Sequence, residues 1–217
     1  MHRMMAPYFL KRIWRGQTLA RILMDKAFSH YTLRGTVVDV GGGRRPDYFN
    51  YFKKDESLGA VSIKPIDGSI SNINFEKDAL PFPDGTADTV ICANVLEHIY
   101  HHDFLTSEMC RILKPGGQLY GFVPFLVNYH PDPHDYFRYT KESLPLILSE
   151  AGFSDISVAG VGGGPFFVNF NNIILSMPRL CRVILFPFYA LLDKVFLKLR
   201  PAAAARYPLG YIFSAKK

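Results

Sequence analysis

The most constraining feature of this sequence is a short β-branched run that ends in three consecutive glycines. Residues 36–40 read Thr-Val-Val-Asp-Val, and Gly41, Gly42 and Gly43 follow directly. A short, nearly continuous apolar run bounded by turn residues is typical of a buried strand in a parallel sheet. Glycines at the carboxyl end of such a strand let a ligand approach bare backbone, because no Cβ blocks it. The sequence therefore predicts a ligand site at this turn.

The turn does not match the common phosphate-binding fingerprints. The dinucleotide fingerprint needs a third glycine where this chain has Pro46, and the P-loop sequence Gly-Lys-Ser/Thr is absent. A Tyr-x-x-x-Lys pair is also absent, which disfavours a nucleotide-dependent oxidoreductase. The remaining pattern is Asp-x-Gly-x-Gly, in which Asp39 can accept hydrogen bonds from a ligand that carries an ammonium group.

Strand and helix patterns alternate along most of the chain. Apolar spacing predicts helices over 8–30, 103–113 and 141–151, and strands over 36–40, 58–63, 86–92, 118–124, 155–161 and 207–214. This rhythm predicts an α/β fold with a mostly parallel sheet and helices on both faces. Four segments follow: a basic helical region (1–34), a ligand-binding core (35–161), a helical aromatic insertion (162–206) and a final strand (207–217).

Charge and cysteine content narrow the function classes. The formal net charge of +6 is concentrated in the first 34 residues and in the insertion. Because this charge accompanies apolar helices and is not interleaved along a groove, we expect no nucleic-acid partner. Three cysteines without metal-type spacing fit a reducing cytosol. The apolar run 183–192 contains Pro187 and is half of the roughly 20 residues that a spanning helix needs, so we expect a cytoplasmic protein.

Five short motifs, in order, extend the pattern beyond the glycine turn. They are Asp78–Pro83, Asn94–Ile99, Leu113–Gly117, Tyr139-Thr140 and Ala151–Phe153. Together with the turn, they make residues 35–161 resemble the class I S-adenosylmethionine-dependent methyltransferases of the type 11 group. The resemblance implies a Rossmann-like, seven-stranded, mostly parallel sheet whose last strand is antiparallel and follows the helical insertion.

The resemblance also implies roles for cofactor-binding residues. The glycine turn with Asp39 would hold the methionine part of S-adenosylmethionine, and Asp78, Ala79 and Leu80 would lie at the adenine. The sulfonium side would be lined by Asn94, Val95 and His98. The family usually places an acid at the end of the second strand, where this chain has Ser62, with Asp67 in the following loop as a substitute. S-adenosylhomocysteine would be the product.

A loop rich in His, Asp, Arg and Tyr follows the strand that ends at Pro124, where the family binds its acceptors. His130 and His134 are the candidate bases, and Asp135 could orient one of them. The structural alternative is that Asp135 pairs with Arg138 to fix the loop. We also assign the acceptor contacts Phe125, Tyr136 and Arg138.

A second set of side chains invites a metal-site interpretation. Glu97, His98, His101 and His102 have helical ligand spacing, but the sequence offers no second anchoring set, so we expect no metal.

The predicted reaction is O-methylation of a sugar or of a lipid-linked or other small-molecule hydroxyl. Alternatives are methylation of a natural product or quinone-like acceptor, and a non-catalytic binding protein on the same fold. The insertion has three interpretations: a cap over the acceptor site, a homodimer interface, or an element that binds an anionic membrane surface at the inner face of the membrane.

Overall fold

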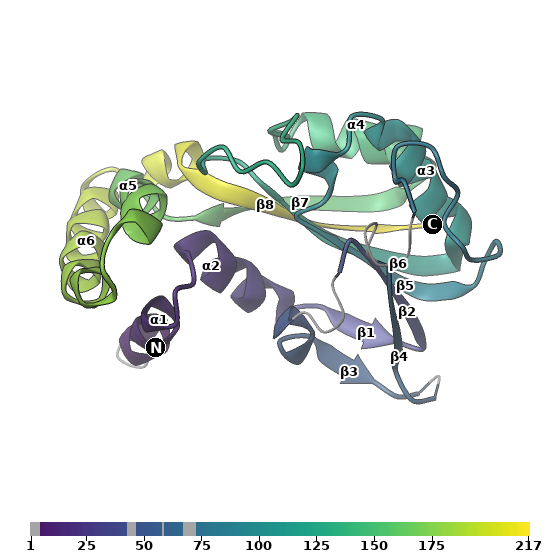
Figure 1. The fold of residues 1–217 in the computed structure, drawn as a ribbon, viewed down its shortest axis with the longest axis horizontal. Coiled ribbons are helices and arrows are strands. Elements are labelled where there is room, and N and C mark those ends of the chain that lie inside the picture. Colours follow the sequence, from purple (N-terminus) through teal and green to yellow (C-terminus); the bar gives the residue numbers. More distant parts are fainter. Residues whose placement is uncertain (1–4, 43–46, 58, 67–72) are drawn as a thin grey trace.

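A six-stranded sheet forms the centre of the protein in the computed structural model, which describes residues 5–42, 47–57, 59–66 and 73–217 (Figure 1). The strands lie in the order β4 (Ser62–Ile66), β2 (Thr36–Val40), β5 (Ala87–Ala93), β6 (Leu113–Pro124), β8 (Pro208–Lys216) and β7 (Ser154–Gly162). The first four are parallel, and β8 is antiparallel to both of its neighbours. This arrangement confirms the expected α/β fold and its antiparallel last strand.

The described residues contribute six strands to this sheet, where seven were expected. Residues 73–86, which lead into β5, form turns with neither helix nor strand. Pro81 and Pro83 lie in this connection, and proline cannot donate a hydrogen bond to a central strand. A separate two-stranded parallel sheet pairs β1 (Thr32–Arg34) with β3 (Lys53–Asp55).

Helices cover both faces of the sheet. Side chains of a strand alternate between its two faces, and the strands here carry apolar side chains on both. Val38 and Val90 point to the face that carries α3 (His102–Ile112) and α4 (Ser143–Glu150). Val37 and Ile91 point to the opposite face, where they pack with α2 (Leu19–Phe28). The sheet is therefore buried between two apolar layers, and its edge at the carboxyl ends of β2, β5 and β6 is left for ligands.

The predicted helix over 8–30 is two helices. α1 (Met5–Trp14) ends before Gly16, whose φ of +88° is a left-handed conformation that glycine adopts without strain. α2 then begins after Thr18, whose side chain accepts a hydrogen bond from the backbone N–H of Arg21. The two helices are tied together by a buried ion pair between Arg12 and Asp25.

Residues 162–206 are mainly helical and pack with α1. They form α5 (Pro165–Ile173), the 3-10 turn η3 (Ile174–Ser176), α6 (Arg179–Leu199) and the 3-10 turn η4 (Pro201–Arg206). Phe9 and Ile13 of α1 share a core with Phe170 of α5 and Phe186 of α6. Figure 1 shows these helices together at one end of the molecule, beyond β7 and β8. The two basic flanks of the sequence thus form one helical unit.

An acid from α6 fixes the start of α5. Asp193 is 3% exposed and accepts hydrogen bonds from the backbone N–H groups of Gly164, Phe166 and Phe167, at 2.7, 3.1 and 3.2 Å. These N–H groups have no partner within their own helix, and the positive end of the helix dipole favours a carboxylate. The acid therefore holds the two helices in register.

Candidate active site

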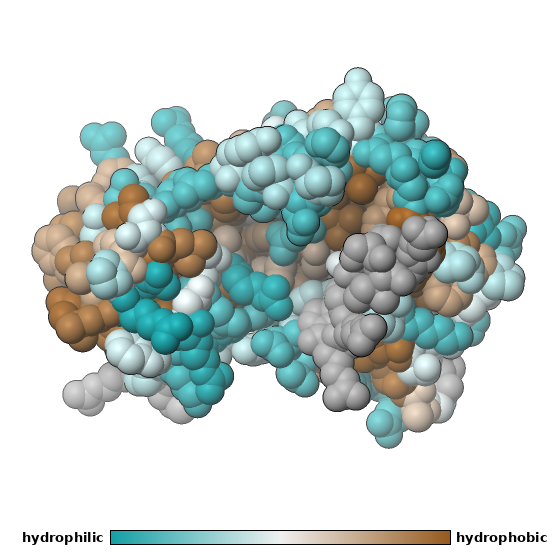
Figure 2. All heavy atoms as spheres, in the orientation of Figure 1, coloured by the Kyte–Doolittle hydropathy of each residue, from teal (hydrophilic) through white to brown (hydrophobic). Residues whose placement is uncertain are grey.

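Two neighbouring cavities lie at the carboxyl ends of β2, β5 and β6. The first has a volume of about 870 Å³ and the second about 650 Å³, both in the range of small-molecule sites. Asn94, His98 and Asp132 line both cavities and form the wall that they share. The space-filling view shows the molecule hollowed between the helical unit and the sheet (Figure 2).

The glycine turn supplies one side of the first cavity. Gly41 lines it with a φ of +79°, and a Cβ built on Gly41 would lie 2.2 Å from Cγ2 of Val95. A Cβ built on Gly42 would lie 1.5 Å from Oδ2 of Asp39. Only glycine fits either position, so the backbone is bare as the sequence predicted. Gly43 lies outside the described residues.

Asp39 lies beneath this turn with no exposed surface. The hydroxyl of Tyr48 donates to its carboxylate, 2.6 Å from each oxygen. Burial raises the pKa of Asp39 to about 7, although the Tyr48 hydrogen bond favours the charged form. Burial beside Asp39 also raises the pKa of Tyr48. Sequence patterns missed Tyr48, whose only signal is its place in an aromatic cluster, Tyr48, Phe49, Tyr51 and Phe52, after the turn.

The expected adenine contacts are not part of this cavity. Asp78 is exposed and accepts a hydrogen bond from the Asn74 N–H, Ala79 is exposed, and Leu80 is buried with its N–H on Glu108. Among the residues that the structure describes, Asn74, Phe75 and Glu76 line the cavity from this segment, and the adenine role of Asp78, Ala79 and Leu80 stays a prediction.

The prediction for Ser62 is wrong in position. β4 begins at Ser62, which pairs with Thr36, and ends at Ile66, which pairs with Val40. Ser62 therefore lies at the amino end of its strand, at the opposite edge from the cavities, because the strand starts four residues later than the apolar pattern suggested. Asp67, the expected substitute, lies outside the described residues.

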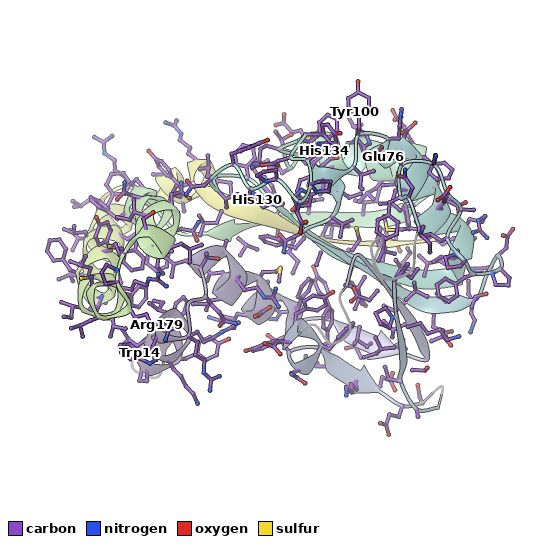
Figure 3. The ribbon with its side chains drawn as sticks, viewed as in Figure 1. Trp14, Glu76, Tyr100, His130, His134 and Arg179 are labelled. Atoms are coloured by element: carbon purple, nitrogen blue, oxygen red, sulfur yellow. The ribbon has the colours of Figure 1, made fainter. Side chains whose placement is uncertain are left out.

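The loop after β6 places its polar side chains in three ways. His134 and Tyr136 line the first cavity, and His130 lines the second (Figure 3). Asp135 accepts two hydrogen bonds from the guanidinium of Arg138, which holds the pKa of this carboxyl well below its usual range, and it also accepts the N–H of His130. The alternative interpretation of this pair, a fixed loop, is what the structure shows.

Two expected acceptor contacts lie away from both cavities. Phe125 packs edge-on against Tyr211, with ring centroids 5.4 Å apart. The guanidinium of Arg138 donates hydrogen bonds to the carboxylate of Asp135 and to the carbonyl of Phe137. Neither side chain lines either cavity. Both follow a strand end, but the fold turns them into the protein, which the sequence alone does not reveal.

The second cavity has walls that the sequence did not predict. Arg21 and Met24 of α2 line it, together with Asn171 and Asn172 from α5. The Asn171 side chain accepts the Ala20 N–H at 2.9 Å, which joins the two helices. Residues 20 and 171 are too far apart in sequence for their contact to be read from a local pattern.

A buried carboxylate and two histidines meet at the shared wall. Glu97 has no exposed surface, and neither of its carboxylate oxygens has a hydrogen-bond partner. Its Oε1 lies 3.6 Å from Nε2 of His98 and 3.7 Å from Nε2 of His130. The ligand set considered from the sequence also contained His102, but the ring of His102 packs against Phe137 and not against Glu97. Sequence spacing missed this cluster because His130 belongs to the next strand-end loop.

Comparisons with known proteins agree with this geometry. Residues 55–121 match the family model described as "Methyltransferase domain", of the type 11 group. The ubiquinone/menaquinone biosynthesis C-methyltransferase UbiE of Francisella tularensis subsp. tularensis (strain WY96-3418) is 24% identical over 202 residues, which cover 71% of this chain and 78% of the relative.

Solved structures share the fold at low identity. Phosphoethanolamine N-methyltransferase 2 of Haemonchus contortus, solved in complex with S-adenosyl-L-methionine, is 18% identical with a TM-score of 0.53, over 91% of this chain and 52% of that chain. The [4+2]-cyclase SpnF is 18% identical with a TM-score of 0.55, over 91% of this chain and 80% of that chain. The predicted fold is thereby confirmed, and the match at residues 55–121 agrees with the predicted family and cofactor, while the acceptor has to be argued from the site.

Proposed function

Because this chain carries a class I S-adenosylmethionine-dependent methyltransferase domain of the type 11 group, we propose that it methylates a hydroxyl of a small acceptor held in the second cavity. A sugar or a lipid-linked molecule is the class of acceptor that we propose. The observation that carries the proposal is the wall shared by the two cavities at Asn94, His98 and Asp132. A donor in one cavity and an acceptor in the other would meet at this wall.

The cofactor fits the first cavity on the chemistry of its lining. The bare backbone of Gly41 and Gly42 leaves room for a ligand, and the acid beneath it, Asp39, suits the ammonium group of a methionine moiety. Val95 and His98 line the same cavity, in keeping with their proposed place near the sulfonium. When bound, S-adenosylmethionine supplies an electrophilic methyl group and leaves as S-adenosylhomocysteine.

The protein would act on the acceptor by alignment and by helping the hydroxyl to lose its proton. Of the three expected catalytic residues, Asp135 is held by Arg138, and His134 lines the first cavity. His130 lines the second cavity, and its ring lies 5.2 Å from that of His98 in the shared wall. We therefore place the acceptor hydroxyl beside His130.

A second candidate reaction is C-methylation of a quinone-like ring, supported by the quinone C-methyltransferases among the relatives. A ring carbon becomes nucleophilic when a neighbouring hydroxyl is deprotonated, so this reaction makes the same demand on the shared wall. Mass spectrometry of the methylated product separates the two reactions, because an O-methyl ether and a C-methyl ring fragment differently.

The test of the cofactor site is calorimetric titration with S-adenosylhomocysteine. Gly42→Ala should abolish binding, because the added Cβ displaces Asp39, whereas Gly160→Ala is the matched control, since its Cβ would meet only an ordinary contact 3.5 Å from Pro208. Undiminished binding by Gly42→Ala would place the cofactor elsewhere. Cofactor binding without methyl transfer to any hydroxyl or quinol acceptor would favour the non-catalytic alternative.

The surface of the helical unit supports a membrane partner. Six apolar side chains of α6, each at least 50% exposed, recur every three or four residues: Leu180, Ile184, Phe188, Leu191, Val195 and Leu199. At 3.6 residues per turn they lie within about 100° of the helix circumference, and we call them the α6 stripe. Figure 2 shows hydrophobic residues gathered at this end of the molecule, and Figure 3 shows Trp14 and Arg179 there.

We propose an anionic membrane surface as the partner of the α6 stripe. Lys194, Lys198 and Arg179 are exposed on the same helix, while its one acid, Asp193, is buried. A second copy of the chain would bring the same positive charges together, whereas anionic lipid would neutralise them. In the part of the chain that the structure describes, each helix is too short or too polar to span a bilayer, so the contact would be interfacial.

Co-sedimentation with phosphatidylglycerol vesicles tests this partner. The wild type should sediment with the vesicles, and less so as salt is added. Phe188→Ser combined with Ile184→Ser should reduce binding, whereas Leu146→Ser, which removes an equally exposed leucine from α4, should not. Equal binding by all three proteins, or a dimer in sizing experiments that the double variant dissociates, would refute the membrane proposal.

A further inference from the structure

The cluster of Glu97, His98 and His130 has the properties of a cation-binding site. The three ligand atoms lie within 4.8 Å of one another. The Glu97 carboxylate is fully buried without a hydrogen bond, which costs several kcal/mol unless a positive charge compensates it. The two distances from Oε1 to the imidazole nitrogens, 3.6 and 3.7 Å, exceed the range of an N–H···O hydrogen bond. The carboxylate is thus close to both rings without being bonded to either.

Backbone carbonyls determine which nitrogen of each ring faces the carboxylate. Nδ1 of His98 lies 2.5 Å from the carbonyl oxygen of His134, and Nδ1 of His130 lies 3.0 Å from that of Asn128. A carbonyl oxygen only accepts, so each Nδ1 must donate its proton. In the neutral rings, each Nε2 then keeps a free lone pair, at 3.6 or 3.7 Å from Oε1 of Glu97. Three electron-pair donors therefore lie within 4.8 Å of one another.

We propose that Glu97, His98 and His130 bind a divalent transition-metal ion, with zinc as the best match. Zinc bonds of about 2.0–2.1 Å to nitrogen and oxygen give tetrahedral ligands about 3.4 Å apart, close to the two measured separations. Histidines that bind metals usually donate their other N–H to a carbonyl or carboxylate, as both rings do here. Two imidazoles and one carboxylate suit zinc, iron or nickel rather than magnesium or calcium.

The position of the site gives the ion a task, and this part of the inference rests on the proposed function. His98 lines both cavities and His130 lines the second, so the fourth coordination position would face the acceptor. A metal lowers the pKa of a coordinated hydroxyl. The hydroxyl would release its proton to solvent, its oxygen would form the bond to the methyl carbon, and the carbon–sulfur bond would break with its electron pair on sulfur. The sulfonium would become a neutral thioether, which balances the charge.

The sequence-based expectation of no metal is revised by this geometry. Helical spacing had suggested His101 and His102 as partners of Glu97, and those histidines are outside the cluster. The third ligand, His130, comes from the loop after β6. Because Glu97 and His98 follow β5, the site forms only when β5 and β6 pair in the folded sheet.

Zinc binding by the chelator-treated protein tests the proposal. Titration against a chromophoric chelator should give one site per chain in the wild type. Glu97→Gln and His130→Gln should each weaken zinc binding by more than about 100-fold. This loss is larger than that caused by removing a residue that only hydrogen-bonds to a metal ligand. His30→Gln, an exposed histidine outside the cluster, is the matched control and should bind as the wild type does. Cobalt in place of zinc should give visible absorption bands that Glu97→Gln loses.

S-adenosylhomocysteine titration of the same metal-free proteins separates the possible failures. Retained S-adenosylhomocysteine binding shows that a variant is folded. If Glu97→Gln does not bind S-adenosylhomocysteine, the zinc affinity of His130→Gln tests the proposal, because His130 is half-exposed and its replacement disturbs the fold less. Absence of a stoichiometric site in the wild type overturns the proposal, as does a site that both variants retain, which would be an adventitious ion only. Wild-type protein that binds zinc but no S-adenosylhomocysteine would overturn the proposed function and leave the metal site standing.

Discussion

Replacing Asp39 by Asn should change how the stability of this protein depends on pH. Asp39 has no exposed surface and lies under the glycine turn, and the Tyr48 hydroxyl donates to it at 2.6 Å. Asparagine has nearly the same shape, keeps an oxygen that can accept from Tyr48, and is neutral at every pH. The variant therefore removes one titration from the folded protein without opening a cavity.

The size of the effect follows from the pKa of Asp39. Burial raises it from 3.8 to about 7. Between about pH 4 and about pH 7, the unfolded chain has released this proton while the folded protein retains it, so the free energy of unfolding falls as the pH rises. Each pH unit is worth about 1.4 kcal/mol, which gives at most about 4 kcal/mol over the window. The contribution is complete below pH 4 and is lost as the pH passes the folded value.

Urea denaturation at a series of pH values measures this effect. Other groups titrate in both proteins, so the quantity of interest is the difference in unfolding free energy between wild type and Asp39→Asn. Relative to the variant, the wild type should lose stability from pH 4.5 to pH 7.5. A difference that stays constant over this range, or one that grows in favour of the wild type, would refute the argument that Asp39 is buried without a compensating positive charge.

Three further predictions concern the same structural features. Arg12→Met leaves the buried Asp25 short of its main partner and should cost about 3–5 kcal/mol in urea denaturation, whereas Arg12→Met with Asp25→Leu should recover most of it; equal loss in both would contradict a buried ion pair. Asp193→Asn should cost about 2 kcal/mol, because hydrogen bonds to a charged acceptor are lost at the start of α5, and an unchanged midpoint would exclude this role. S-adenosylhomocysteine binding near pH 6.5 should release protons, measured by calorimetry in buffers of different ionisation enthalpy, because its ammonium group favours ionised Asp39; release that persists in Asp39→Asn would point to another group.

The parts of the site that the sequence predicted well are those with a local physical cause. The strand over 36–40 and the glycines after it form a continuous pattern, and the structure shows why Gly41 and Gly42 admit no side chain. Asn94 could be found because it follows β5 directly, and its φ of 55° reflects the sharp turn at the strand end.

The parts that the sequence missed depend on register or on long-range contacts. Ser62 was placed at the wrong end of its strand because the apolar run ends at Ile63, whereas β4 continues through Lys64 and Pro65, which an apolar pattern does not include. Sequence patterns also missed residues 73–76, which line the first cavity next to the turn at Asn74, while the adenine assignment at Asp78 stays a prediction. The contact of Glu97 with His130 joins two loops, and no periodicity along one element encodes it.

The two cavities are lined by different segments of the chain. The first cavity is lined largely by residues 73–76 and 94–101, inside the region that matches the family model at 55–121. The second cavity takes much of its lining from residues 16–24 and 171–175, which lie outside that region. Arg21 of α2 and Asn171 of α5 therefore lie outside the part of the chain that matches the family model. Under the proposed function, the residues that hold the donor would lie mostly inside the matched region and those that select the acceptor mostly outside it, and the two groups would meet at the shared wall of Asn94 and His98.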